Sequence, residues 1–193
     1  MDMSVLSRAD LVSELLSTPV YASGANPLHV SDAVAKSGVP GQAETVLAHR
    51  LEVARELLLR DLREQMRRGP VMTSPQVLRD WLRLKLAALP YEVFSVLWLD
   101  NQHHLIEYDE LFRGTLSQTS VYPREIVKQA LARNSAAAVL VHNHPSGQAT
   151  PSRADELLTQ GLKSALNLVD VRVVDHFIVA GDAVVSFAES GLI

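Results

Sequence analysis

The first third of the chain carries apolar residues at helical spacing, interrupted by clusters of proline and glycine. A short apolar-rich segment, residues 9–16, ends before Thr18-Pro19. A longer helix is predicted over residues 43–68, where leucine, valine and alanine recur every three or four positions. Gly69-Pro70 ends it, because proline cannot continue a helix, and marks the best domain boundary. The pattern therefore predicts a small all-helical domain over residues 1–69.

Beyond this boundary the pattern changes, and predicted helices alternate with short apolar strands. Ser74-Pro75 provides a cap and a proline at the first helical position, and this helix is expected to run to Leu89. Residues 92–99 are mostly β-branched, aromatic and apolar, as in a buried strand. The other predicted strands are 104–108, 111–117, 136–141, 169–175, 177–180 and 183–187, and the other helices are 123–134 and 153–166. This alternation is typical of an α/β domain, here residues 70–193.

Composition narrows the classes of protein that fit this pattern. The 193 residues are 47% hydrophobic, enough for a substantial core, and include no cysteine. Disulfides, thiolate zinc sites and cysteine nucleophiles are therefore excluded. The first ten residues lack the apolar core of a signal peptide. The longest apolar run, residues 136–141, is too short to span a bilayer. We expect a cytoplasmic protein with no membrane partner.

The charge distribution argues against a protein that coats nucleic acid. The net charge is −4 and the pI is near 6.0, whereas nucleic-acid-binding domains are usually basic. One local exception is a set of four arginines near the end of the predicted long helix. Cations there complement the helix dipole, so we expect a solvated helix end, with a phosphate-contacting patch as the alternative. The four are Arg60, Arg63, Arg67 and Arg68.

Candidate chemistry lies where the predicted strand 136–141 ends. His142 and His144 are two residues apart, so on an extended chain both imidazoles point the same way. Asp155 follows in the first turn of the next predicted helix, and the intervening loop contains prolines and a glycine that can fold it back. Two imidazoles and a carboxylate suit a catalytic zinc with a fourth position open to water. Alternatively, the histidines are polar strand-end residues and Ser152-x-x-Asp155 is a helix capping box.

The same segment resembles the JAMM metalloprotease signature, also called JAB or MPN, in which His-x-His precedes Pro-Ser-x-x-Asp. Four stretches together resemble the bacterial RadC family, and the similarity extends over residues 73–193. It implies an MPN (JAB) domain, which is a mixed β-sheet flanked by helices and is similar to the cytidine-deaminase-like fold. The four stretches are residues 121–125, 142–147, 175–176 and 186–192.

The resemblance also implies roles for individual residues. By it, His142, His144 and Asp155 are the ligands of one Zn²⁺ per chain. The family's catalytic glutamate matches Glu92, a lone carboxylate at the head of an apolar strand, whose alternative role is that of an exposed strand-start residue. Ser152 matches a serine thought to hydrogen-bond the reacting oxygen, and helix capping is its other expected role. The implied reaction is hydrolysis of a peptide or isopeptide bond in a peptide or protein substrate by metal-activated water.

Relatives of this kind usually begin with a helix-hairpin-helix that binds the DNA backbone. Residues 11–16 and 38–59 resemble a degenerate form of that unit. The stretch between them is short, and Pro40 interrupts the expected Gly-x-Gly turn. These departures argue against DNA binding by this part of the chain, so DNA is only the alternative partner. The corresponding alternative function is a DNA-associated accessory protein of repair or recombination, in which the MPN domain is a non-catalytic scaffold.

Two other activities fit the sequence less well. A nuclease is suggested only by the string His142-Asn143-His144, and the nuclease motif of similar name has widely separated residues. A zinc deaminase needs cysteine ligands that this chain lacks.

The remaining histidines are not expected to bind the metal. We expect His29 and His49 to face solvent and His103-His104 to have no partner at ligand spacing. For His176 we expect simple packing or exposure, with the orientation of a metal ligand as the alternative.

Overall fold

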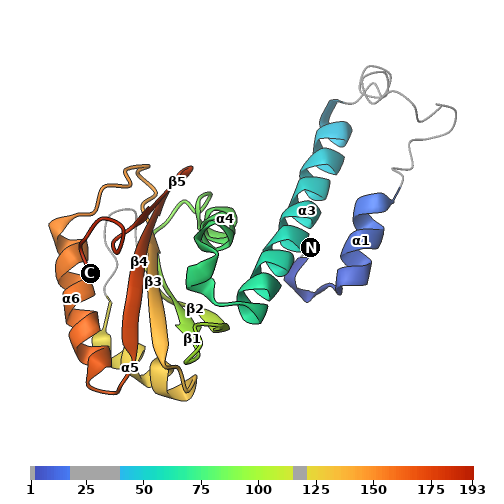
Figure 1. Ribbon diagram of the computed structural model, residues 1–193. Helices are drawn as coiled ribbons and strands as arrows, with labels where there is room; N and C mark the ends of the chain where they lie inside the picture. Colours follow the sequence, from blue (N-terminus) through green and yellow to red (C-terminus); the bar gives the residue numbers. More distant parts are fainter. Residues whose placement is uncertain (1–2, 18–39, 115–120) are drawn as a thin grey trace, which may run out of the picture. The chain divides into compact units, whose positions relative to one another are not determined.

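The computed structural model describes residues 3–17, 40–114 and 121–193. The chain divides into two compact units, Met1–Asp61 and Leu62–Ile193 (Figure 1). The predicted domain boundary at Gly69-Pro70 stays a prediction. The predicted loops at Thr18-Pro19 and residues 23–27, together with His29, Gly38-Val39 and residues 115–117, lie outside the described residues.

The described part of the first unit is helical. It contains η1 (Met3–Val5), α1 (Arg8–Leu16) and the first part of α3 (Pro40–Arg68). A capping box starts α1, because the Ser7 hydroxyl accepts from the backbone N–H of Asp10 and the Asp10 carboxylate accepts from the backbone N–H of Ser7. The helix α3 begins three residues earlier than predicted. Proline suits a first helical position, since its missing N–H would have no partner there.

The second unit is built around one mixed sheet of five strands. Their order is β2-β1-β3-β4-β5, and only the β3/β4 pair is parallel. Helices α5 and α6 cover one face of the sheet and α4 covers the other (Figure 1). This unit contains η2 (Val71–Thr73), α4 (Pro75–Leu86), β1 (Val93–Leu99), β2 (Leu105–Arg113), α5 (Pro123–Ala132), β3 (Ala137–Asn143), α6 (Arg153–Asn167), β4 (Arg172–Ala180) and β5 (Ala183–Ser186). The predicted α/β fold class, a mixed sheet flanked by helices, is confirmed.

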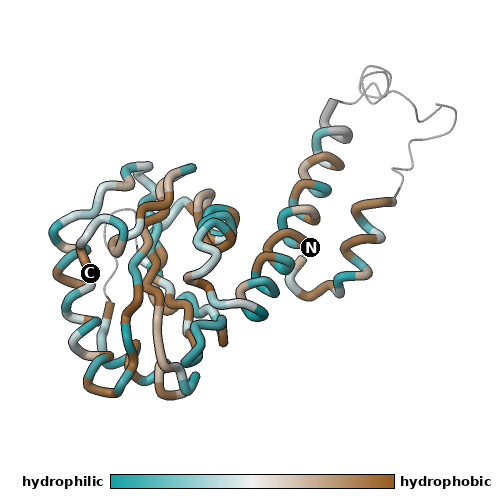
Figure 2. The backbone as a smooth tube through the Cα atoms, in the orientation of Figure 1, coloured by the Kyte–Doolittle hydropathy of each residue, from teal (hydrophilic) through white to brown (hydrophobic). Residues whose placement is uncertain are grey.

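Burial explains why the central strands are so apolar. Every residue of β1 and β3 is buried, because both faces of these strands are covered. Along the strands, alternate side chains form the core toward α5 and α6, with Phe94, Trp98 and Leu140 among them. Figure 2 shows this apolar colouring along the strands of the sheet, whereas α3 alternates between apolar and polar turns.

Several element boundaries differ from the prediction. Helix α4 ends at Leu86 and not at Leu89, because the residues before Pro90 form a tighter turn in which Leu89 N–H donates to the Leu86 carbonyl. In place of the predicted strands 104–108 and 111–117, the described residues form one strand, β2, which ends at Arg113. The predicted strands 169–175 and 177–180 are also one strand, β4, since the buried polar residues at its centre have hydrogen-bond partners.

Candidate metal centre

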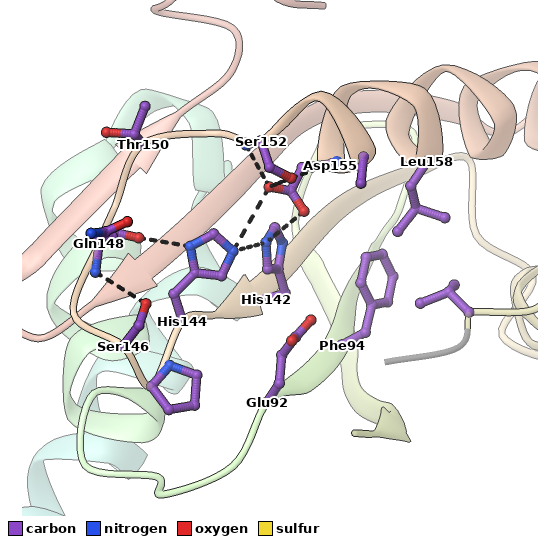
Figure 3. A pocket seen from close by; sticks show the side chains of 13 residues that line it. Glu92, Phe94, His142, His144, Ser146, Gln148, Thr150, Ser152, Asp155 and Leu158 are labelled. Atoms are coloured by element: carbon purple, nitrogen blue, oxygen red, sulfur yellow. Dashed lines mark hydrogen bonds and ion pairs between the residues drawn. The ribbon is translucent and has the colours of Figure 1, made fainter. Parts of the chain in front are cut away.

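A pocket of about 570 Å³ lies at the end of β3, against the start of β1 and the first turn of α6 (Figure 3). One wall is apolar and is formed by Phe94, Val121 and Leu158. The opposite wall is the loop that follows β3, with Ser146 and Gln148. The other lining residues are Glu92, His142, His144, Pro145, Thr150, Ser152, Ala154 and Asp155. All five predicted site residues therefore line one pocket.

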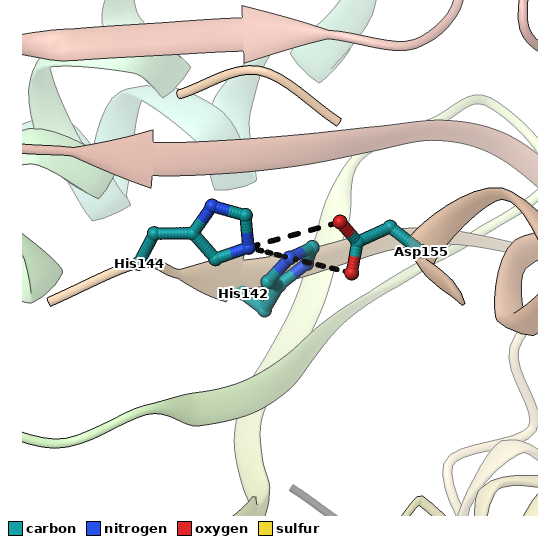
Figure 4. Close-up of side chains that lie close together, drawn as sticks. All are labelled: His142, His144 and Asp155. Atoms are coloured by element: carbon teal, nitrogen blue, oxygen red, sulfur yellow. Dashed lines mark hydrogen bonds and ion pairs between the residues drawn. The ribbon is translucent and has the colours of Figure 1, made fainter. Parts of the chain in front are cut away.

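Three potential ligand atoms converge in this pocket. The Nε2 atoms of His142 and His144 are 2.9 Å apart. The Nε2 of His142 lies 3.3 Å from Oδ1 of Asp155, and that of His144 lies 3.8 Å from Oδ2 (Figure 4). These are the residues of a group whose ligand atoms all lie within 4.8 Å of one another. The backbone N–H of His144 donates to the carbonyl of Val179 at 2.8 Å, which keeps the chain extended past β3 and both rings on one side.

Asp155 is both part of a capping box and part of this cluster. Its Oδ2 accepts from the backbone N–H of Ser152 at 2.7 Å and from the Ser152 hydroxyl at 2.6 Å. Its Oδ1 faces His142. Burial raises the pKa of Asp155, but the neighbouring His142 and the hydrogen bonds from Ser152 outweigh it and hold the pKa well below its usual value. The carboxylate is therefore ionised, and its two oxygens serve separate purposes.

The loop after β3 fixes the ring of His144. The Nδ1 of His144 lies 2.7 Å from the backbone carbonyl of Gln148, which can only accept. The loop returns to the ring through a turn in which Gly147 N–H donates to the His144 carbonyl, with Gly147 at a φ of 80° that favours glycine. In the neutral ring, Nδ1 of His144 therefore carries the proton, and Nε2 is left bare toward the pocket.

His142 contacts a third histidine, His176, which is fully buried on β4. The Nδ1 of His142 lies 2.8 Å from Nε2 of His176, and Nδ1 of His176 lies 2.6 Å from the hydroxyl of Thr159. The rings of Phe94 and Phe187 pack on His176, with centroids at 5.8 and 4.6 Å. Burial and the neighbouring His142 hold the pKa of His176 well below its usual value, so it is neutral. His176 thus contacts the cluster directly, and the alternative that it orients a metal ligand stays a prediction.

Glu92 immediately precedes β1, and Figure 3 shows its carboxylate on the side of the pocket where the imidazoles lie. The side-chain amide of Asn143 bonds to both neighbours of Glu92. Its Oδ1 accepts from Val93 N–H at 2.8 Å, and its Nδ2 donates to the Tyr91 carbonyl at 2.9 Å. The Glu92 carbonyl itself accepts from Gly114 N–H at 2.8 Å. The backbone of Glu92 is therefore held on both sides by the residue between the two histidines.

The sequence pattern indicates no role for Asn143 or Thr159, and for His176 it favours simple packing or exposure over contact with His142. Alternation along β3 contained one signal, because a polar residue between two inward-facing histidines must point to the opposite, buried face. The contact between His142 and His176 joins residues 34 positions apart, and the pairing of β3 with β4 sets it. Sequence spacing could not reveal that pairing.

The other polar features noted in the sequence have partners elsewhere in the two units. All four arginines near the end of α3 pair with carboxylates, which supports their reading as a helix end and weakens the phosphate patch. His49 bonds to Glu14, and His104 bonds to Asp100. Within the described part of the chain, no helix has the length and apolarity needed to cross a membrane.

Comparison with known proteins agrees with this geometry. The sequence profile of the RadC-like JAB domain matches residues 72–192. UPF0758 proteins of Methylibium petroleiphilum and Leptothrix cholodnii are 63% and 62% identical over 147 and 143 residues, or 76% and 74% of this chain. Each match covers 64% of the relative's own length. A UPF0758 protein of Aromatoleum aromaticum is 53% identical over 188 residues, 97% of this chain and 82% of that protein. The chain belongs to the RadC-like JAB domain family.

Proposed function

We propose that this protein is a zinc-dependent hydrolase that cleaves a peptide or isopeptide bond with a metal-activated water. The observation that carries the proposal is the convergence of two imidazole nitrogens and one carboxylate oxygen in an open pocket that a second carboxylate also lines. Three protein ligands with an open position are typical of catalytic rather than structural zinc.

The chemistry of the converging atoms fits a divalent cation. Nε2 of His144 is bare, because the proton of that ring is on Nδ1, and Oδ1 of Asp155 can only accept. Lone pairs that face one another within 4 Å repel unless a cation or a proton lies between them. Imidazole and carboxylate ligands both suit zinc. His142, His144 and Asp155 would hold the ion.

The chain's own groups supply the remaining steps. A bound zinc ion would polarise the scissile carbonyl and lower the pKa of a water molecule. The carboxylate of Glu92 accepts the proton of the attacking water and delivers it to the leaving nitrogen. The hydroxyl of Ser152, which bonds to Asp155 in the resting site, donates to the oxygen that gains negative charge. The clamp from Asn143 keeps Glu92 at the pocket wall.

The pocket lining favours an amide substrate over a phosphodiester. None of the described residues that line it is lysine or arginine, the side chains that would recognise a phosphate group. Its apolar wall and its hydroxyl and amide groups suit a polypeptide segment with its alternating side chains and peptide groups. This argues for the peptidase and against the nuclease.

Metal analysis tests the proposal first. We expect about one zinc per chain in the wild-type protein, as the ligand set requires, and none in Asp155→Asn. Asp10→Asn is the matched control, because Asp10 caps α1 with the same bonding pattern and contacts no histidine of the cluster. Wild-type protein that takes up no zinc when supplied with it would contradict the proposal, as would equal zinc in Asp155→Asn.

The zinc-loaded protein is then tested on peptide and isopeptide substrates. Glu92→Gln is expected to keep its zinc and lose hydrolysis, because an amide cannot accept the proton of the attacking water. Hydrolysis that survives in Glu92→Gln would remove Glu92 from the mechanism.

A further inference from the structure

A chain of hydrogen bonds connects two of the proposed ligands through residues that do not touch the pocket. It runs from the backbone carbonyl of Asp155 to the hydroxyl of Thr159 at 2.6 Å, and from that hydroxyl to Nδ1 of His176 at 2.6 Å. It continues from Nε2 of His176 to Nδ1 of His142 at 2.8 Å. Every side chain in it is almost completely buried, so water is excluded from the chain.

The carbonyl at one end determines the direction of every bond in this chain. A carbonyl can only accept, so the single hydroxyl proton of Thr159 points to Asp155. The Thr159 oxygen therefore accepts from Nδ1–H of His176. A neutral imidazole has one ring proton, so Nε2 of His176 is bare and accepts from Nδ1–H of His142. The ring proton of His142 is then used, and its Nε2 presents a lone pair to the pocket.

We propose that Thr159 and His176 are positioning residues of the metal centre, which hold His142 in the tautomer and ring orientation that present Nε2 to the ion. The inference rests on the proposed function, since it assigns a purpose to these residues only if the centre binds metal. Partners that orient ligand imidazoles are usually carboxylates, carbonyls or water. Here the partner of His142 is a second imidazole, that of His176. The Thr159 hydroxyl fixes the proton of His176 on Nδ1, because that hydroxyl itself donates to the backbone carbonyl of Asp155.

Because Thr159 is buried, loss of its hydroxyl should change which ring nitrogen of His176 carries the proton. Without the hydroxyl, Nδ1–H of His176 has no acceptor, and an unpaired buried donor is unfavourable. The proton is then better placed on Nε2, where it can bond to Nδ1 of His142. This reverses the chain and puts the ring proton of His142 on Nε2, the atom that must be bare to bind zinc.

The test compares Thr159→Val with Thr159→Ser in the full chain. Both change one group at the same position, but only serine keeps the hydroxyl. With Zn²⁺ titrated against a competing chelator, we expect Thr159→Val to bind about 10- to 100-fold more weakly than wild type, as for other lost orienting partners. Thr159→Ser is expected to retain most of the wild-type affinity. Thermal unfolding of the metal-free proteins checks that each variant is folded.

NMR of nitrogen-labelled histidine gives a readout that general damage to the fold would not mimic. In the metal-free wild type and in Thr159→Ser, His176 should carry its proton on Nδ1, and in Thr159→Val on Nε2. If Thr159→Val does not fold, His176→Gln and His176→Leu replace it. Glutamine can accept from His142 and donate to Thr159 as His176 does, and leucine can do neither, so only the leucine variant should lose zinc affinity.

The possible outcomes separate this inference from the proposed function. If wild type binds zinc and Thr159→Val binds it equally well, or if His176 keeps its proton on Nδ1 in Thr159→Val, the positioning role is wrong and the metal centre stands. If wild type binds no zinc, the proposed function fails and this assignment fails with it.

Discussion

At the scale of single residues, each of His142, His144 and Asp155 has two polar side-chain atoms with different contacts. Nδ1 of His142, Nδ1 of His144 and Oδ2 of Asp155 all bond to the protein. The remaining atom of each residue points into the pocket (Figure 4). The rings and the carboxylate are thus oriented before any ion arrives, which lowers the entropy lost on binding.

Asn143 offers a test at this scale, because it holds the backbone of Glu92 without facing the metal ligands. We expect Asn143→Ala to keep its zinc and to lower kcat by about 10- to 100-fold, since small displacements of a catalytic group have effects of this size. Metal analysis and steady-state hydrolysis of the same samples measure the two quantities. Asn101→Ala, at an exposed turn, is the control. Unchanged kcat in Asn143→Ala would show that Glu92 needs no such clamp.

At the scale of the elements, the sequence predicted the middle of each strand better than its ends. The mostly apolar strands 92–99 and 136–141 correspond to β1 and β3, because both faces of these strands are buried. The end of β3 was placed too early, since His142 and Asn143 are polar and yet buried within the strand. Polar residues are accommodated there by partners on other elements, and a single sequence does not contain those contacts.

The same reasoning applies to the candidate site. The spacing of His142 and His144 predicted their common direction, and the helix signal Ser152-x-x-Asp155 predicted the capping box, which the structure contains. Ligand and cap were alternatives for Asp155, whereas its Oδ2 takes part in the cap and its Oδ1 faces His142, so the two roles are compatible. The contacts of His176 depend on the packing of α6 on β4, which local pattern does not encode.

The start of α6 gives a second prediction. Ser152→Ala removes the cap while leaving the carboxylate of Asp155, so we expect it to lower the free energy of unfolding of the metal-free protein by about 1 kcal/mol. Urea denaturation measures this. Ser7→Ala makes the same change at the start of α1 and is expected to have an effect of similar size in the first unit. A much larger loss in Ser152→Ala alone would mean that Ser152 does more than start the helix.

The partly buried phenol of Tyr108, between β2 and β1, should make the free energy of unfolding depend on pH in the alkaline range. Its hydroxyl donates to Ser95 at 2.8 Å, its ring meets Trp81 edge to face, and burial raises its pKa above the usual value. The unfolded chain ionises this phenol near pH 10, whereas the folded chain keeps it neutral. Proton loss therefore favours the unfolded state, and the stability supported by neutral Tyr108 is lost progressively as the pH rises above about 10.

Urea unfolding across this pH range measures the effect. Tyr108→Phe should be less stable than wild type by about 1 kcal/mol near neutral pH, because it lacks the hydrogen bond to Ser95. The difference should shrink above about pH 10, since phenylalanine cannot ionise. Tyr122→Phe, at an exposed position, is the control. A difference that stays constant with pH would show that Tyr108 ionises alike in both states.

At the scale of the whole molecule, all proposed ligands and their supporting residues belong to the unit Leu62–Ile193. Zinc should therefore stabilise this unit, by about 2.7 kcal/mol when free zinc is a hundred times its Kd. Thermal unfolding with and without a chelator measures the increment, which Asp155→Asn should abolish. A zinc-dependent shift of equal size in that variant would place the binding site elsewhere.

The double use of Asp155 has a consequence for how this protein changes over evolutionary time. In a descendant that abandoned hydrolysis, a carboxylate at this position would still stabilise the start of α6, so selection for folding would favour its retention. The bare nitrogens of His142 and His144 have no such second use. Among diverged sequences, an aspartate at this position is therefore a poor indicator of retained hydrolytic activity. Loss of the two histidines is the better indicator that the activity has been lost.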